Sequence, residues 1–271
     1  MSVDWNGPYR VVDLSVTVSE DLPSSWPNHM PFASKIWNYF AKTEEVGGTL
    51  PSFAPYQTRF WVIDEHCGTH FDGPTHFIPP NSSDLPWAGV YGDETGDQVP
   101  LHHLMGRGVC IDVRHLRTGT LSDGESPWIR VDDIKNWEGQ HGALEPGSVV
   151  LFYTGWDEFY VAGPASQRYV HNALVLKRGE AWPAPNVDVI LYLFENGVRC
   201  VGTDGPSMGA AHDGGPVHYE GLSRGMRYVE ALSGLGQLTP RDFFFMFLPI
   251  KVKGATGGPG RAIALMGPSE T

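Results

Sequence analysis

The sequence predicts an α/β fold, with strands and helices mixed in a single domain over residues 1–271. Short β-branched and apolar segments predominate, and only a few segments between them have helical periodicity. The 33 glycines and 22 prolines are spread along the chain, which predicts many tight turns and no long linker. No period of ~20–50 residues is visible, which argues against solenoids and propellers.

The first half of the chain predicts strands interrupted by one long irregular segment. Residues 9–18 are β-branched and partly alternating, as in a first strand. Residues 19–50 carry prolines and several large aromatic side chains, so we expect a long excursion there and no regular element. Residues 58–65 predict a strand, and the apolar runs at 109–113 and 149–153 predict buried strands.

The second half of the chain predicts helices that alternate with strands. Residues 131–139 have helical character. From Val187, apolar residues recur at i, i+3, i+4 and i+7; Asn186 can cap this helix and Gly197 can end it. We also expect a helix at 226–235, and strands at 198–203, 243–250 and 261–266.

The composition favours an acidic, cytoplasmic protein with a small-molecule substrate. Its 19 basic and 31 acidic residues give a net charge of −12 with neutral histidine. Nucleic acids and anionic membranes select clustered Lys and Arg, so neither is expected as a partner. The longest strongly apolar run, at 243–250, is far shorter than the ~20 residues that span a bilayer, and no secretory signal is visible. Three scattered cysteines are typical of a reducing cytoplasm.

The strongest functional pattern is the segment HCGTHFDGPTHF at 66–77. It gathers three of the 11 histidines and one aspartate, namely His66, His70, Asp72 and His76. Imidazole together with carboxylate suits zinc, manganese or iron, whereas all-oxygen sites suit magnesium or calcium. A chance arrangement has no reason to collect all four groups in a turn-rich segment, so the pattern predicts a divalent metal site.

The glycines and the proline of this segment disfavour a helix. In a strand that leads into a turn, His70 and Asp72 share one face, and His66 joins them if the chain bends at Gly68. The expected site therefore has two imidazoles and one carboxylate around the ion, with positions open for water and substrate. Cys67 is interpreted as a buried bystander, although a cysteine beside histidines can be a nucleophile.

The motif resembles the H-x-G-T-H-x-D-x-P-x-H signature of the metal-dependent cyclase-like hydrolases, a family that includes bacterial kynurenine formamidase and isatin hydrolase. The resemblance covers most of the chain. VVDLSVTV near the start is similar to the family's N-terminal strand, VGTDGPSM at 201–208 to its second motif, and VHYEGLSRGMRYVEAL at 217–232 to its third. The resemblance implies a swivelling β/β/α-type fold and a homo-oligomer, at least a dimer, in which the N-terminal excursion reaches the partner's site.

The resemblance also implies roles for individual residues. His66, His70 and Asp72 would bind the catalytic metal, Mn²⁺ or Zn²⁺. His76 would lie next to the metal as a base. In the formamidase branch a later His and Glu hold a second metal. His218 and Glu230 have the matching separation here, with Asp72 placed to bridge the two ions.

Four residues are expected to contact the substrate. Ser207 matches the T-D-x-x-S pattern of the family, which implies a polar contact with substrate or water. His212 lies among glycines, either in a flexible loop or over the substrate. Trp61 and Phe71 are close in sequence to the metal-binding residues, so we expect them beside a substrate ring. The pair at 102–103, two histidines after a proline, is interpreted as solvated.

The expected reaction is hydrolysis of a small aromatic amide, formamide or lactam. A divalent ion lowers the pKa of bound water from ~15.7 toward ~7, and it also polarises a substrate carbonyl. His76, with an ordinary pKa of ~6.5, can accept a proton from that water and pass it to the leaving nitrogen. No G-x-S-x-G elbow occurs in the sequence, so a serine acyl-enzyme is not supported.

Three alternatives stay open. The protein could be a lactone hydrolase or cyclase of the same family, or a metal- or ligand-binding protein without catalysis. It could also be a non-haem iron oxygenase with a triad of His70, Asp72 and His218. In that case Arg224 or Arg227 could bind a keto-acid carboxylate, but His66 and His76 would have no role.

Overall fold

The structure, a computed structural model, describes residues 9–40 and 56–267. The strands that build the main sheet are β1 (Arg10–Asp13), β4 (His70–Asp72), β5 (Met105–Asp112), β7 (Val149–Tyr153), β9 (Cys200–Thr203), β10 (Arg227–Glu230), β11 (Phe243–Pro249) and β12 (Gly257–Met266). Two smaller sheets pair β2 (Ala33–Asn38) with β3 (Thr58–Val62), and β6 (Trp128–Ile129) with β8 (Ala184–Pro185). The helices are α1 (Val131–His141), α2 (His171–Leu174), α3 (Val187–Glu195) and α4 (Gly215–Leu222).

The main sheet has eight strands in the order β1-β12-β11-β5-β7-β9-β10-β4, and it closes into a barrel. Closure occurs at the short strand β4, which pairs antiparallel with β10 on one edge and with the first three residues of β12 on the other. Strand β1 pairs with the far half of β12. The strands β5, β7, β9 and β10 are mutually parallel, so crossover segments that contain the helices connect them.

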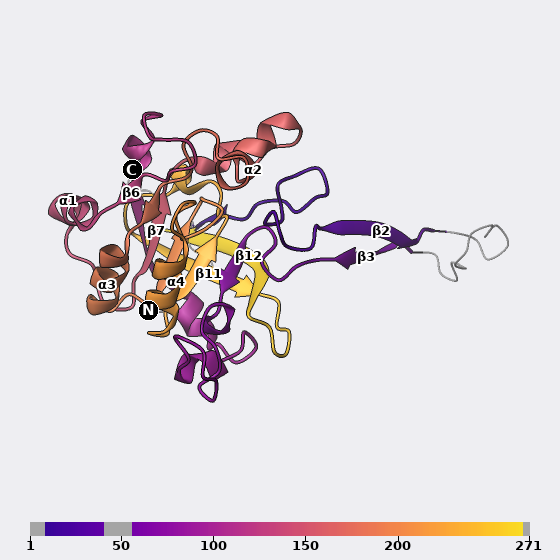
Figure 1. Cartoon of the computed structure of the whole chain (residues 1–271), viewed down its shortest axis with the longest axis horizontal. Coiled ribbons are helices and arrows are strands. Elements are labelled where there is room, and N and C mark those ends of the chain that lie inside the picture. The colour runs from indigo at the N-terminus through magenta and orange to yellow at the C-terminus, as the bar shows by residue number, and fades with distance from the viewer. Residues whose placement is uncertain (1–8, 41–55, 268–271) are drawn as a thin grey trace.

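Both faces of the parallel strands are buried. In β7, Val149 and Leu151 belong to the apolar cluster inside the barrel, whereas Val150 and Phe152 belong to the cluster under the helices. This double burial explains why the sequence of β7 is a continuous apolar run without alternation. Helices α3 and α4 contact each other, as do α1 and α3, and Figure 1 shows them together on one side of the barrel.

Most of the predicted elements are present. The helix at 187–196 is α3, whose first turn is capped by a hydrogen bond from the Val189 backbone N–H to Asn186 Oδ1 (3.1 Å), and Gly197 follows with a φ of 80°. The helix at 131–139 is α1, and the strands at 109–113 and 149–153 lie in β5 and β7. The closing strands are β11 and β12, although β12 already begins at Gly257, inside the glycine-rich loop.

The helix expected at 226–235 is wrong. Residues 227–230 form the strand β10, and all four are buried. A helix would bury only one side of such a segment, whereas β10 lies between β9 and β4 and is covered on both faces. Ala231 then adopts a φ of 53°, which ends the strand.

The excursion expected at 19–50 contains an irregular loop followed by an arm. The arm is the β2–β3 hairpin, which extends away from the rest of the molecule in Figure 1. Residues 41–50 of the predicted excursion lie outside the described residues. Large apolar side chains of the arm are exposed, among them Trp37 (55%) and Trp61 (65%). Among the described residues, no helix has both the length and the apolar character that crossing a bilayer requires.

Candidate metal centre

The centre begins on strand β4, where alternation sorts the side chains. His70 and Asp72 lie on the outer face of the barrel wall, and both are buried. Phe71 lies on the opposite face, fully buried among the apolar residues inside the barrel. Phe71, expected beside a substrate ring, therefore points away from His70 and Asp72, because neighbouring residues in a strand point to opposite faces.

Two further groups come from distant parts of the chain. The antiparallel register pairs Glu230 of β10 directly with His70, and the Glu230 Oε2 lies 3.6 Å from His70 Nε2. Helix α4 contributes His218, whose Nε2 lies 3.4 Å from Glu230 Oε1 and 3.5 Å from Asp72 Oδ2. The Met208 backbone N–H donates to Glu230 Oε1 (2.6 Å). The structure thus brings His218 and Glu230 together around Asp72.

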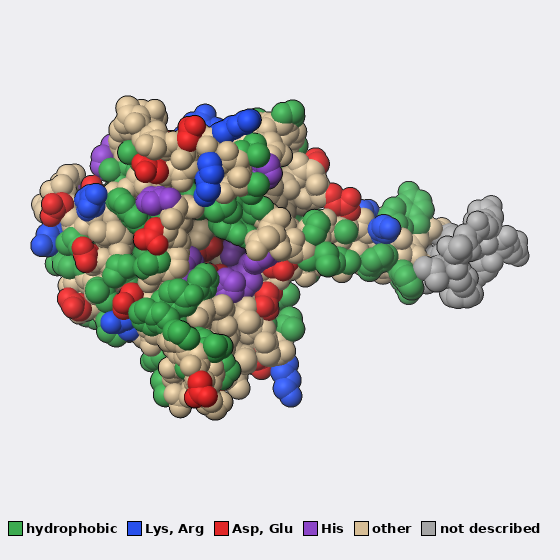
Figure 2. All heavy atoms as spheres, in the orientation of Figure 1, with side chains coloured by type: hydrophobic (Ala, Val, Ile, Leu, Met, Phe, Trp, Pro, Cys, Tyr) green, Lys and Arg blue, Asp and Glu red, His purple; other side chains and the backbone are tan. Residues whose placement is uncertain are grey.

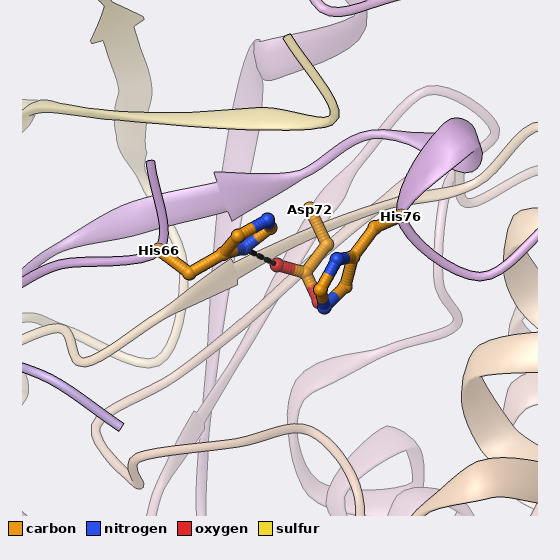
Figure 3. Close-up of side chains that lie close together, drawn as sticks. All are labelled: His66, Asp72 and His76. Atoms are coloured by element: carbon orange, nitrogen blue, oxygen red, sulfur yellow. Dashed lines mark hydrogen bonds and ion pairs between the residues drawn. The ribbon is translucent and has the colours of Figure 1, made fainter. Parts of the chain in front are cut away.

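His66 reaches the cluster from the loop before β4. Gly68 has a φ of 63°, and a Cβ there would lie 2.5 Å from Val18 Cγ2, so the bend expected at this position requires glycine. His66 Nδ1 lies 2.9 Å from Asp72 Oδ1. Figure 3 shows the Asp72 carboxylate beside the imidazoles of His66 and His76, with its contact to His66 dashed.

His76 comes from a single 3-10 turn, Pro74–His76, that follows β4. Its ring stacks on the ring of His66, with centroids 3.8 Å apart. Burial lowers the pKa of His76 to about 4, although the nearby Asp72 carboxylate opposes the shift. The His76 imidazole is therefore neutral at pH 7, which leaves a nitrogen able to accept a proton.

Hydrogen bonds orient the other imidazoles. His70 Nδ1 lies 2.8 Å from the Gly68 carbonyl oxygen, and His218 Nδ1 lies 2.7 Å from the Gly214 carbonyl oxygen. A carbonyl only accepts, so both Nδ1 atoms carry hydrogen, and both Nε2 atoms face the carboxylates. This is the orientation in which a histidine binds a metal through Nε2.

The donor set fits a divalent cation. Ligand atoms within 4.8 Å of one another form two groups that share one carboxylate: His66, Asp72 and His76, and His70, Asp72 and Glu230. A cavity opens over the cluster, and no Lys or Arg is among the described residues that line it. The buried carboxylates of Asp72 and Glu230 therefore need another source of positive charge. Nitrogen and oxygen donors in this ratio suit zinc, manganese or iron.

Without an ion, protons supply that charge. Burial acts to lower the pKa of His70 and His218, but hydrogen bonds to Asp72 and Glu230 outweigh it and raise both values to about 10. Burial acts to raise the pKa of Asp72, but the charge of His76 and hydrogen bonds with His218, His66 and His70 outweigh it and hold the value well below the ordinary one. The cluster is built to bind positive charge.

A cavity of about 220 Å³ opens over the cluster. Figure 2 shows histidine side chains at a hollow near the base of the arm. The aromatic residues on its wall are Trp26, Phe77, Tyr160 and Tyr169. His29 also lines it, with its Nδ1 3.1 Å from Asp64 Oδ1. Sequence reasoning assigned none of these five residues to the site. Phe77 ends the motif itself, whereas the other four come from segments that meet the motif only in the folded chain.

The substrate contacts predicted from the sequence are only partly at the cavity. Ser207 lines it. His212 does not: its Nδ1 accepts a hydrogen bond from the Ser126 backbone N–H (3.1 Å), and its ring packs edge-on against Trp128. Trp61 lies on the exposed arm and does not line this cavity. Within a single chain, neither His212 nor Trp61 lies at the cavity where the sequence predicted a substrate contact.

The two arginines that the oxygenase alternative would need are engaged elsewhere. Arg227 is fully buried, forms an ion pair with Glu94 and donates to the Gly225 carbonyl oxygen. Arg224 pairs with Glu220, so neither arginine lines the cavity as a keto-acid anchor would. Cys67 is completely buried, and burial raises the pKa of its thiol to about 11, which agrees with a bystander.

A buried His/carboxylate cluster on the outer face of a mixed α/β barrel is the kind of site that a metal-dependent hydrolase uses. The sequence model of the family described as "Putative cyclase" matches residues 12–210. The chain belongs to this family.

Characterised relatives agree with this class. The isatin hydrolase of Roseibium aggregatum is 28% identical over 233 residues, which are 83% of this chain and 80% of that protein. The kynurenine formamidase of Salinibacter ruber is 24% identical over 258 residues, 93% and 96% of the two chains. Isatin hydrolase A from Labrenzia aggregata, solved with benzyl benzoate, superimposes with a TM-score of 0.73 at 24% identity over 96% of this chain and 94% of that one.

These comparisons confirm two predictions. The fold resembles solved members of the family, including an isatin hydrolase bound to the product analogue thioisatinate (TM-score 0.72, 21% identity, 96% and 93% of the chains). The predicted enzyme class is a metal-dependent hydrolase of carbon–nitrogen bonds other than peptide bonds, and the curated relatives confirm it.

Proposed function

We propose that this chain hydrolyses a small aromatic amide, formamide or lactam, and opens the ring when the substrate is cyclic. One observation carries the proposal: the buried His/carboxylate cluster lies at the floor of a cavity with four aromatic side chains on its wall. The cluster supplies a place for a carbonyl and for water, and the aromatic wall suits a flat ring. The activities named for the relatives are of this kind.

The proposed cofactor is Mn²⁺ or Zn²⁺. His66, His70 and Asp72 would hold the catalytic ion, and His218 with Glu230 would hold a second ion bridged by Asp72. A bound ion would polarise the substrate carbonyl and lower the pKa of a water molecule. The short distances from Asp72 to His66, His70 and His218 support a shared carboxylate.

Residues of the chain would perform the other steps. His76, neutral at pH 7, would take a proton from the attacking water and deliver it to the leaving nitrogen. Ser207 would contact the substrate or the water through its hydroxyl. Trp26 and Tyr160 would hold the substrate ring in place of the residues predicted from the sequence.

We also propose a homo-oligomer in which the arm packs against a second copy of the chain. The exposed apolar side chains of the hairpin support this, because a single chain leaves them in water. In such an assembly Trp61 would reach the partner's side of the interface. We expect residues 1–271 to act as one hydrolase domain in the cytoplasm, since all three cysteines are buried thiols and none forms a disulfide.

Metal analysis of the isolated protein, followed by a substrate panel with that metal restored, tests the proposal. The panel contains isatin, N-formylkynurenine, a simple lactam and a lactone of similar size. Anaerobic turnover of an amide with Mn²⁺ or Zn²⁺ is expected. Oxygen uptake with Fe²⁺ and 2-oxoglutarate would support the oxygenase instead, faster lactone opening would support a lactonase, and tight binding without product would support a binding protein.

A further inference from the structure

Thr256 contacts both ends of the metal-binding motif, although it lies outside the family match at 12–210. Its carbonyl oxygen accepts a hydrogen bond from the Gly73 backbone N–H (2.9 Å), just after β4. Its hydroxyl lies 3.0 Å from His66 Nε2, and it donates to Glu65 Oε1 at 2.5 Å. Its backbone N–H donates to Glu65 Oε2 (3.0 Å). One residue, immediately before β12, thus holds both the segment before β4 and the turn after it.

The direction of these hydrogen bonds fixes the tautomer of His66. A carboxylate only accepts, so the single proton of the Thr256 hydroxyl is committed to Glu65. The hydroxyl oxygen can then only accept from His66, which requires a hydrogen on His66 Nε2. The neutral form of His66 therefore carries its lone pair on Nδ1.

This tautomer is opposite to that of the other two ligand histidines. His70 and His218 each carry hydrogen on Nδ1, held by a backbone carbonyl, and present Nε2 to the carboxylates. His66 presents Nδ1, 2.9 Å from Asp72 Oδ1. Two acceptor atoms at this distance in a buried site repel each other unless a proton or a metal ion lies between them.

We infer that Thr256, through Glu65, is a positioning residue that makes His66 bind the metal through Nδ1 while His70 and His218 bind through Nε2. This inference rests on the proposed metal site. Neither Thr256 nor Glu65 belongs to the proposed ligand set, and their action on the ion passes entirely through the His66 ring. Partners of this kind change metal affinity by ~10–100-fold when they are removed.

Thr256→Val tests the inference because it removes the hydroxyl and keeps the shape and both backbone hydrogen bonds. We expect its Zn²⁺ affinity, measured by competition with a chelator, to fall ~10–100-fold. Thr256→Ser restores the hydroxyl and should return the affinity to within a few-fold of the natural protein. Thr239→Val is the matched control, because Thr239 is exposed and its hydroxyl bonds the Arg241 carbonyl instead. No substrate is needed, so the result is independent of the reaction.

A second measurement reads the binding nitrogen directly. In the Zn²⁺-loaded natural protein, histidine ¹⁵N NMR should show His66 coordinated through Nδ1 with a hydrogen on Nε2, and the opposite for His70 and His218. Coordination of His66 through Nε2, or natural affinity in Thr256→Val, overturns the inference while the metal site stands. A natural protein that binds no Zn²⁺ overturns both. If Thr256→Val does not fold, the NMR result decides.

Discussion

His76 differs from the other histidines of the centre in its hydrogen bonding. His66, His70 and His218 each have a protein partner on the nitrogen that points away from the cluster. His76 is held by ring stacking on His66, and no hydrogen bond to its nitrogens is present among the described residues. A base must keep a nitrogen free for water, so this arrangement suits proton transfer better than metal binding.

We therefore expect His76→Ala to retain its metal and to lose ~10²–10⁴ in turnover, the usual contribution of a general base. His70→Ala is the matched comparison, and it should lose metal and activity together. Metal content by elemental analysis and kcat on the same samples provide the measurement. Because His76 is also within reach of the ion that His66 and Asp72 would hold, a metal-free His76→Ala protein would reassign His76 as a ligand.

Strand β12 approaches the metal-binding motif so closely that one of its glycines has no room for a side chain. A Cβ on Gly257 would lie 2.3 Å from the Phe71 carbonyl oxygen and 2.7 Å from His66 Cε1. The carbonyl belongs to the backbone of β4 and cannot move without breaking the barrel pairing. At the next residue, Gly258, the nearest atom to a Cβ would be 3.3 Å away.

Gly257→Ala should therefore lower the thermal midpoint by several degrees and weaken metal binding, because either β12 or the His66 ring must shift. Gly258→Ala, one residue along the same strand, should have a much smaller effect on both. Thermal unfolding monitored by circular dichroism, with and without Zn²⁺, compares the two variants. Equal effects of the two substitutions would show that the approach to His66 is not the cause.

Among the helices and strands, the sequence predicted those whose structure depends mainly on their own residues. Helix α3 has its own cap and stop, and β7 has an unbroken apolar run, so both were predictable. Strand β10 was not: its apolar residues also fit a helix, and only its position between β9 and β4 makes it extended. Propensity is a weak guide where long-range pairing decides.

The residues of the metal centre also fall into two groups: those that one short segment predicts, and those that only long-range packing brings together. His66, His70, Asp72 and His76 lie within one short segment, and their chemistry is visible in the sequence. His218 and Glu230 were found only through the family resemblance, since the packing of helix α4 places His218 and the register of β10 against β4 places Glu230. Nothing in the sequence signals Trp26, His29 or Thr256, because each gains its role from a loop that folds against the motif.

For the molecule as a whole, the cluster predicts how stability depends on pH. The folded, metal-free protein holds extra protons on His70 and His218, whose pKa values are raised to about 10. Their contribution is fully present below their ordinary pKa of ~6.5, and it is lost as pH rises toward 10. In the metal-loaded protein the imidazoles are neutral ligands, so this loss should not occur.

We expect urea unfolding to show a falling free energy for the chelator-treated protein between pH 6.5 and 10, and a smaller fall for the Zn²⁺-loaded protein. The gap between the two curves should widen with pH. Other groups titrate in this range in both forms, so the comparison between forms isolates the cluster. Parallel curves would contradict the assignment of the protons to these histidines.

The arm makes a separate prediction about assembly. Light scattering at low protein concentration should give a mass of at least two chains. The double variant Trp37→Ser with Phe60→Ser, at two exposed and mutually packed rings of the hairpin, should lower that mass without changing the barrel. Matched changes at exposed Leu121 and Leu248, away from the hairpin, serve as the control. A single-chain mass for the natural protein would contradict the oligomer.

The closure of the barrel has a mechanical consequence. Its last seam is made by β4, which contributes only three residues to each of its two neighbours. The proposed ligands lie on both β4 and β10, and His66 is hydrogen-bonded to Thr256, just before β12. A bound ion would therefore cross-link these strands where the barrel closes. Separation of β4 from its neighbours would then also release the ion. We therefore expect transient opening of the barrel wall to limit the rate at which a bound metal leaves, even though the cavity itself is open to solvent.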